Sequence, residues 1–193
     1  IHLMEMSSEP ERALHSADGL NGLCPDAGHM NHMPAHIYVL VGDYEKAQKV
    51  SEDAIRADDM YRAYCETKNN YLLACCHDLH LMMFTCMFLG QFRPALAAAD
   101  KVRSLVTRDV VTIPDRPKLT QTVEGYYAMR SHVLVRFGRW QEIIDEPDTR
   151  EPELYPVTAA MQRYAKGVAY ATQRNFSAAR DQRSLLLESI ESI

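Results

Sequence analysis

The sequence predicts an all-α protein built from repeated helical hairpins, and three observations support this prediction. One phrase, a turn followed by an aromatic residue and then Ala or Ile three positions on, recurs along the chain. Glycine stands in three of these turns, where the first helix of a pair must end and where glycine tolerates the left-handed conformation. The composition agrees, because 47% hydrophobic and 24% charged residues are typical of a globular protein with a sizeable core.

The copies of this phrase also set the length of the repeat. Their aligned small or branched residues are Ala13, Ala47, Ala95, Ile143 and Ala179. These are separated by 34, 48, 48 and 36 residues. A period of 34 residues is typical of tetratricopeptide (TPR) repeats, which are helix–turn–helix units. We interpret the longer spacings as the same unit with about 14 additional loop residues, near 62–75 and 110–123.

The sequence therefore predicts a single all-α domain, a TPR-like α-solenoid of about five helical hairpins. The predicted hairpins span 1–26, 27–60, 72–108, 119–150 and 155–193. The first and last are incomplete, and the opening Ile1-His2-Leu3-Met4 resembles the middle of a helix. We therefore expect the chain to be a fragment of a longer one. The first helix of each hairpin is expected to line a concave groove.

Seven of the eight histidines fall at repeat positions expected to face that groove. They occupy positions two (His29 and His77), five (His32 and His80) and nine (His2, His36 and His132). Positions two, five and nine are spaced i, i+3, i+7, so they share one face of a helix. Random placement of eight histidines would put about one of them at such positions across the repeats. The sequence therefore predicts a histidine cluster in the groove.

Such a cluster indicates a metal site, because neutral imidazole is the commonest metal-ligand side chain. Neighbouring first helices lie on the order of 10 Å apart, so facing histidines can share an ion at roughly 2.0–2.1 Å per Zn–N bond. We expect one or two transition-metal ions, with zinc, copper and iron all compatible. The expected ligands are His2, His29, His32, His36, His77 and His80. Glu5 is expected to be a further ligand or a general base. His132, Tyr127 and Tyr164 are expected to contact a substrate in the groove.

Two other interpretations of the cluster stay open. Protonated histidines could hold an acidic peptide or carboxylate, with binding that strengthens below pH ~6.5. The histidines could also form a hydrogen-bonded network without a ligand. For function, the histidines favour a metal-dependent enzyme, hydrolytic or oxidative, with metal-bound water or oxygen as the reactive species. The alternative is a TPR scaffold that binds a peptide or partner protein in the groove without metal.

Several classes of function leave no trace in the sequence. The net charge of −5 argues against a general nucleic-acid binder. No apolar run approaches the ~20 residues of a membrane span, so no membrane partner is expected. No GxSxG, Walker A, GxGxxG or HExxH motif occurs. The five cysteines form no regular framework, which favours reduced thiols and a cytoplasmic location. The oligomeric state is not predicted.

Several segments resemble an uncharacterised family of TPR-domain proteins from bacteria, fungi and algae. The similar segments are GHMNHMPAHIY (28–38), HDLH (77–80), VLVRFGRW (133–140), LYPVTAAM (154–161) and YAKG (164–167). The resemblance covers nearly the whole chain and implies a TPR fold with a histidine-rich groove and additional N-terminal hairpins. It implies no particular reaction. The family tends to carry Asn where this chain has Asp78, and a carboxylate there could alter the surroundings of His77 or His80.

Overall fold

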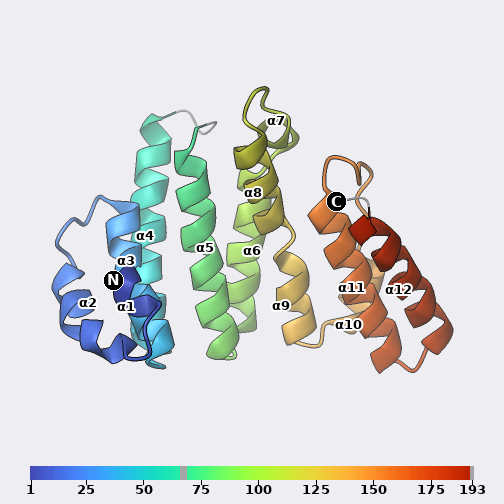
Figure 1. The fold of residues 1–193 in the computed structure, drawn as a ribbon, viewed down its shortest axis with the longest axis horizontal. Helices are drawn as coiled ribbons and strands as arrows, with labels where there is room; N and C mark the ends of the chain where they lie inside the picture. Colours follow the sequence, from blue (N-terminus) through green and yellow to red (C-terminus); the bar gives the residue numbers. More distant parts are fainter. Residues whose placement is uncertain (66–68, 192–193) are drawn as a thin grey trace. The chain divides into compact units, whose positions relative to one another are not determined.

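The computed structural model describes residues 1–65 and 69–191, and every regular element in these ranges is a helix (Figure 1). The all-α prediction is therefore confirmed. The chain divides into two compact units, Ile1–Lys101 and Val102–Ile193, which are described separately below. The arrangement of all hairpins in one continuous solenoid domain stays a prediction.

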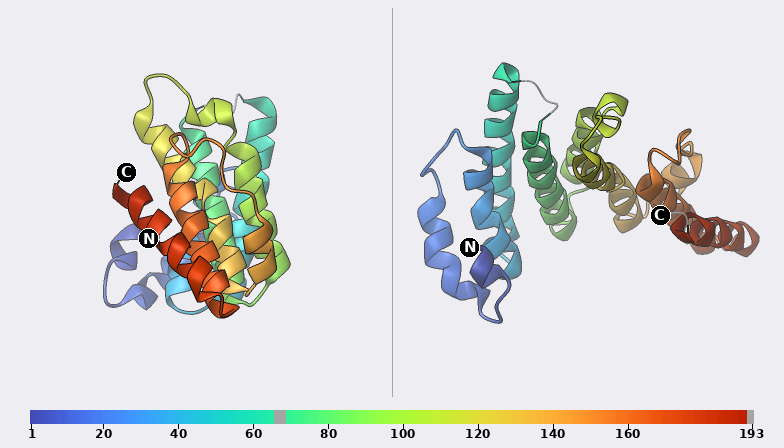
Figure 2. Two further views of the ribbon diagram at one scale, coloured as in Figure 1. Left: turned by 90° about the vertical axis from the view of Figure 1, so that its right-hand side faces the viewer. Right: turned by 45° about the horizontal axis from the view of Figure 1, so that its top comes forward.

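The first unit is built around three long helices that pack against one another. Its elements are α1 (His2–Glu5), a 3₁₀ helix (Pro10–Ala13), α2 (Leu14–Leu20), α3 (Gly28–Leu40), α4 (Tyr44–Tyr64), α5 (Tyr71–Phe88) and the start of α6 (Phe92–Leu105). Helix α3 packs against α4 and α5, and α1 packs against α3 (Figures 1 and 2). Small residues such as Ala35 and Ala47 are fully buried in this core, which lets the helices approach closely.

The turns between the long helices have the backbone geometry that the sequence predicts. Gly42 ends α3 with a φ of 81°, and Gly90 ends α5 with a φ of 70°, both in the left-handed region. The side chain of Asp43 then caps α4 by accepting a hydrogen bond from the backbone N–H of Lys46. Tyr44 follows, and its ring stacks on Phe88 of α5 at 4.9 Å.

The long loops expected near 62–75 and 110–123 are shorter than predicted, and this expectation is corrected. In the first 48-residue spacing the additional residues lengthen α4 to 21 residues and α5 to 18. In the second, residues of 110–123 belong to the end of α7 (Arg108–Val111) and to α8 (Pro117–Tyr127). The aromatic rings of Tyr61 and Tyr71 pack together at 4.3 Å, so apolar contact continues along these extensions. Residues 66–68 of the first predicted loop lie outside the described residues.

The second unit contains the end of α6 and a set of shorter helices. These are α7 (Arg108–Val111), α8 (Pro117–Tyr127), α9 (Arg130–Arg136), α10 (Trp140–Asp145), α11 (Pro156–Thr172) and α12 (Phe176–Glu191). Helices α11 and α12 form an antiparallel pair, and α8, α9 and α10 each contact α11 (Figure 2). The first helix of the predicted hairpin 119–150 is interrupted between Tyr127 and Arg130, which gives α8 and α9.

Helix α5 is apolar and long enough, by length and composition alone, to cross a membrane. The expectation that no segment approaches such a span is therefore wrong as stated. Half of this helix is buried inside the structure, where it packs against α3 and α4. The core helix of a globular protein meets the same criteria, which accounts for its composition.

The start of α3 generates a first prediction, since Gly28 is buried where a side chain would not fit. A Cβ at this position would lie 1.9 Å from Oδ1 of Asp58 and 3.0 Å from the Tyr71 hydroxyl. Asp58 is only 3% exposed and accepts a 2.7 Å hydrogen bond from Tyr71, so it has little room to move. We expect Gly28→Ala to lower the free energy of unfolding by about 1–3 kcal/mol.

Urea denaturation of this variant and of Gly19→Ala measures the effect. Gly19 lies in α2, and a Cβ added there would meet no neighbouring atom within 4 Å, so alanine should be neutral or slightly stabilising. Equal stabilities for the two variants would contradict the close packing of α3 on Asp58.

Candidate metal centre

Three imidazole rings of the first unit converge on one point. The Nε2 atom of His32 lies 2.8 Å from Nε2 of His36 and 2.9 Å from Nε2 of His77. His32 and His36 are one helical turn apart on α3, and His77 reaches them from α5. We call His32, His36 and His77 the histidine triad. In the described residues, the triad is one of three groups whose ligand atoms lie close enough together to hold a metal ion.

Burial separates the triad from bulk water. The side chain of His32 is fully buried and that of His36 is 10% exposed, while His77 is half-buried. The buried stripe of α3, which includes Ile37 and Tyr38, fixes the rotation of this helix against its neighbours. The position of the triad is therefore set by the core rather than by a loop.

Carboxylates lie at the opposite nitrogen of two triad rings. Oε1 of Glu5 is 2.7 Å from Nδ1 of His36, and Oδ1 of Asp78 is 3.3 Å from Nδ1 of His32. The Glu5 carboxylate holds the proton on Nδ1 of His36, which leaves the lone pair of its Nε2 for a metal. Nδ1 of His32 is buried without a hydrogen-bond partner, so Asp78 lies near it without fixing its proton. Metal-binding histidines in proteins are commonly oriented by such partners.

Proton counting shows why a cation fits at the point where the rings meet. When Nδ1 carries the proton, as Glu5 requires of a neutral His36, Nε2 is an acceptor only. Nε2 of His32 lies 2.8 Å from this acceptor and 2.9 Å from Nε2 of His77, and a single ring proton on His32 cannot serve both neighbours with full hydrogen bonds. Tetrahedral zinc with Zn–N bonds of 2.0–2.1 Å needs nitrogens about 3.3 Å apart, so a shift of roughly 0.5 Å admits the ion.

The electrostatics of the triad keep the rings neutral, which is the state that binds metal. Burial, with the charges of the other histidines, lowers the pKa of His32 to about 2. Burial likewise lowers the pKa of His77 to about 4, helped by the charges of His36 and His80. Burial also lowers the pKa of His36, although Glu5 acts in the opposite direction.

Glu5 connects the triad to His2 and forms a second group that could hold an ion. Its Oε2 lies 2.8 Å from Nδ1 of His2, and the rings of His2 and His36 meet edge to face at 5.0 Å. Burial raises the pKa of Glu5, but hydrogen bonds and charges from His2 and His36 outweigh it and lower the pKa. Glu5 is therefore a carboxylate at neutral pH and is suited to accept from both rings.

Sequence reasoning missed a buried polar chain behind the triad. Asp78 is fully buried, and burial together with the charge of Asp58 raises its pKa to about 8. Asp58 in turn accepts the hydroxyl of Tyr71 at 2.7 Å. Asp58 follows Ala47, Ser51 and Ala54 at helical spacing along the buried stripe of α4. A charged residue on this stripe was the signal that could have revealed it.

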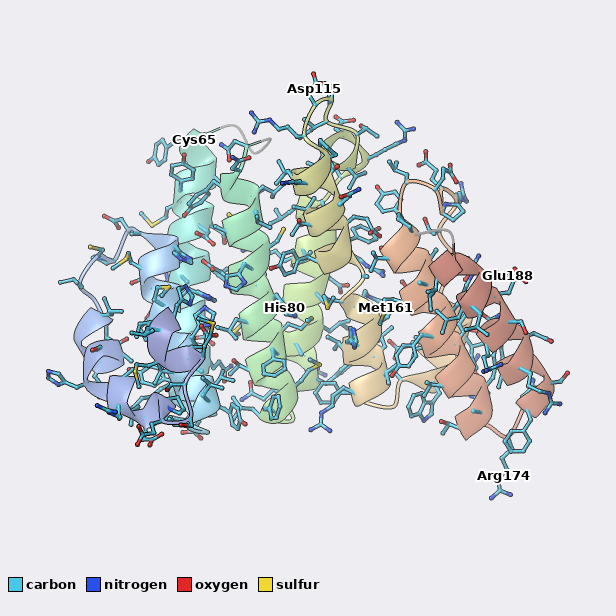
Figure 3. All side chains as sticks on the ribbon, in the orientation of Figure 1. Cys65, His80, Asp115, Met161, Arg174 and Glu188 are labelled. Carbon is cyan, nitrogen blue, oxygen red and sulfur yellow. The ribbon has the colours of Figure 1, made fainter. Side chains whose placement is uncertain are left out.

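The remaining predicted ligands, His29 and His80, lie around the triad, whereas His132, predicted to contact a substrate, lies in the other unit. His29 is exposed, stacks on His32 at 5.7 Å and forms the third group with His32 and Asp78. His80 lies one turn after His77 on α5 (Figure 3) and belongs to none of the three groups. His132 is exposed in the second unit, where its ring lies 6.5 Å from that of Tyr164.

Tyr127, also predicted to contact a substrate, lies in the second unit with its ring 5.3 Å from that of Tyr155. Cysteines play no part in the three candidate metal groups. The thiols of Cys75 and Cys76 are buried and free, and burial raises the pKa of both, that of Cys76 to about 12. Protonated thiols are poor metal ligands.

Comparisons with protein-family models, with characterised proteins and with solved structures found no match to this chain. The resemblance to a TPR family therefore stays a prediction based on the segments quoted above.

The lowered histidine pKa values predict how the stability of the metal-free protein depends on pH. His32 and His77 titrate near 6.5 when unfolded but near 2 and 4 when folded. Below pH ~6.5 the unfolded chain therefore binds more protons than the folded protein, so stability falls as the pH is lowered toward 4. Thermal melting in the presence of a chelator, between about pH 7.5 and about pH 5, should show a falling midpoint.

Two variants distinguish the contribution of the triad to this pH dependence from that of other titrating groups. His77→Gln should flatten this dependence, whereas His15→Gln should leave it unchanged because His15 is exposed on α2. A midpoint that is constant over the range, or that changes equally in both variants, would contradict neutral buried histidines.

Proposed function

We propose that this chain is a metal-binding protein in which Nε2 of His32, His36 and His77 ligate one transition-metal ion. The observation that carries the proposal is that Nε2 of His32 lies 2.8 Å from Nε2 of His36 and 2.9 Å from Nε2 of His77, with all three ligand atoms within 4.8 Å of one another. The carboxylate of Glu5 on the opposite nitrogen of His36 supports it, because it orients that ring for ligation. Burial supports it further by keeping the rings unprotonated.

The ligand set favours zinc among the three metals that the sequence leaves open. Three histidines with one open position are a known catalytic zinc set. Copper also suits imidazole ligands and binds such sites strongly. Non-haem iron commonly takes a carboxylate as a direct ligand beside two histidines, whereas Glu5 and Asp78 face the Nδ1 side. We therefore propose zinc first and copper second.

We extend the proposal to a hydrolytic enzyme, because three protein ligands leave a position for water. A zinc ion at such a position lowers the pKa of bound water to about 7, which supplies a nucleophile at neutral pH. The residues of the chain would hold the rings in place: Glu5 keeps the proton of His36 on Nδ1, and the core excludes water from His32. Exposed His29, stacked on His32, lies on the solvent side of the site.

We also propose that the hairpins are TPR-like repeats. Four of the five residues aligned in the sequence support this, because Ala13, Ala47, Ala95 and Ile143 are all at least 97% buried, whereas Ala179 is only partly buried. The left-handed glycines that join α3 to α4 and α5 to α6 agree with it. In such repeats the first helices, here α3 and α5, face the groove that would hold a substrate.

Elemental analysis of the untagged protein, purified without chelator or nickel resin, tests the metal proposal. About one equivalent of zinc or copper is expected. His32→Ala and His77→Ala should lose it, because each removes one of three ligands, while His132→Ala in the second unit should retain it. Circular dichroism confirms that each variant is folded.

A metal-free protein that shows no thermal shift with Zn²⁺, Cu²⁺ or Fe²⁺ would contradict the proposal. Tighter binding of acidic peptides at about pH 5.5 than at about pH 7.5 would then identify the groove as a peptide site instead.

We expect the Glu5 carboxylate to raise the affinity of the site for zinc without being a zinc ligand itself. Glu5→Gln keeps the size of the side chain but removes the charge that holds the Nδ1 proton. We expect zinc affinity to fall by about 10–100-fold with one equivalent still bound at saturation. Competition with a chromogenic chelator measures this. Glu9→Gln, which alters an exposed pair with Arg12, is the matched control and should bind like the parent protein. Loss of all binding in Glu5→Gln would instead show that Glu5 is a direct ligand.

A further inference from the structure

The second unit contains a pocket of about 300 Å³ that the proposed metal site does not use. Helices α6, α8 and α11 and the segment after α10 supply its walls. Arg103, Arg150, Tyr127 and Tyr155 line it, together with one carboxylate, that of Glu146. The size is at the lower end of pockets that hold small organic ligands.

The charge of Arg103 is only partly compensated beside this pocket. Glu146 accepts from Nη1 of Arg103 at 2.5 Å and from Nη1 of Arg130 at 2.8 Å, so one carboxylate is shared by two guanidinium groups. These three side chains are no more than 20% exposed. A largely buried guanidinium whose carboxylate is shared favours a further anion nearby.

One donor of Arg103 is unsatisfied inside the structure, so a ligand would reach it only after a small shift of the guanidinium. Its Nη2 atom is buried and has no hydrogen-bond partner, while its Nε donates to the backbone oxygen of Tyr127. The guanidinium lies 5.0 Å from the centre of the Tyr127 ring, as in a cation–π contact. Arg150 is exposed and lines the same pocket, which adds a second cation.

The acidic residues that flank Arg150 are engaged elsewhere. Asp148 pairs with Lys166 at 2.6 Å, and Glu151 pairs with Arg108 at 2.9 Å. The cation of Arg150 is therefore left to face the pocket with little competition from these neighbours in the sequence.

The apolar walls are aromatic and preformed. The rings of Tyr127 and Tyr155 lie 5.3 Å apart at an angle of 44°. Beside them, buried Gln162 accepts from the backbone N–H of Thr149 and donates to the backbone oxygen of Pro147, which fixes the chain after α10. A planar ring can pack on tyrosines without a large loss of conformational entropy, since the walls are already ordered.

We propose that this pocket binds a small aromatic oxyanion. Its carboxylate or phosphate pairs with Arg103 and Arg150, and its ring packs against Tyr127 and Tyr155. The forked guanidinium donors match both oxyanions, and the tyrosine rings select the aromatic body. The inference is independent of the metal proposal, because it uses no residue of the first unit.

Titration of the full chain with benzoate and with phenyl phosphate, followed by NMR or calorimetry, tests the proposal. Saturable binding of either compound is expected. The compound that binds more tightly shows whether the pocket prefers a carboxylate or a phosphate. Acetate and inorganic phosphate, which lack the ring, should bind about tenfold more weakly than their aromatic counterparts. Equal binding with and without the ring, or no saturable binding of either aromatic compound, would overturn the proposal.

Variants locate the site. Arg150→Ala should weaken binding about tenfold while leaving the fold intact, because Arg150 is exposed. Tyr127→Leu should weaken the binding of the aromatic compounds more than the binding of the anions that lack a ring. Arg183→Ala, an exposed position on α12, is the matched control and should have no effect. Unchanged binding in both Arg150→Ala and Tyr127→Leu would place the anion elsewhere and overturn the assignment.

Discussion

The contact between His32 and His77 is the interaction on which the first unit depends. It joins α3 to α5 through two imidazole nitrogens 2.9 Å apart, at a position where His32 has no exposed surface. An imidazole buried so deeply is tolerated only when it is neutral and its polar atoms face suitable partners. Burial keeps the ring neutral, and His36 and His77 lie at Nε2, whereas Nδ1 is buried 3.3 Å from Asp78 without a hydrogen bond.

A chain of polar groups extends this constraint from α3 and α5 to α4. Asp58 of α4 lies against the backbone of Gly28 and accepts the hydroxyl of Tyr71. The three helices are therefore held in one register by polar contacts as well as by small apolar residues. Several atoms of this chain, among them Nδ1 of His32 and Oδ2 of Asp58, are buried without a hydrogen-bond partner, so this packing carries an energetic cost. The absence of a side chain at Gly28 is what allows α3 to approach the carboxylate.

The two carboxylates next to the triad have different electrostatic surroundings. Glu5 is partly exposed and is stabilised as an anion by two histidines. Asp78 is fully buried beside a second carboxyl group, and its pKa is raised to about 8. The rings of His36 and His32 therefore have unequal partners, and a bound ion would experience an asymmetric outer environment.

Much of the helical pattern and the existence of a histidine cluster could be predicted from the sequence. Glycines at the turns are local signals, and the i, i+3, i+7 spacing of His29, His32 and His36 fixes their common face. The approach of Asp58 to Asp78 could not be predicted, because it depends on how α4 and α5 meet. His80 lies one turn beyond His77 on α5 but belongs to none of the candidate ligand groups. This too could not be predicted, because it depends on how the helices meet in space.

The small helix α1 gives the buried triad a kinetic property. It has four residues and none of them is buried, so it cannot be stable by itself. Contacts of Glu5 with His36, and partial packing of Met4, hold it against α3. Brief detachment of α1 would remove the Glu5 carboxylate from Nδ1 of His36 while α3, α4 and α5 remain folded. The rate at which the His36 ring exchanges its tautomer would then follow this local opening rather than unfolding of the whole unit.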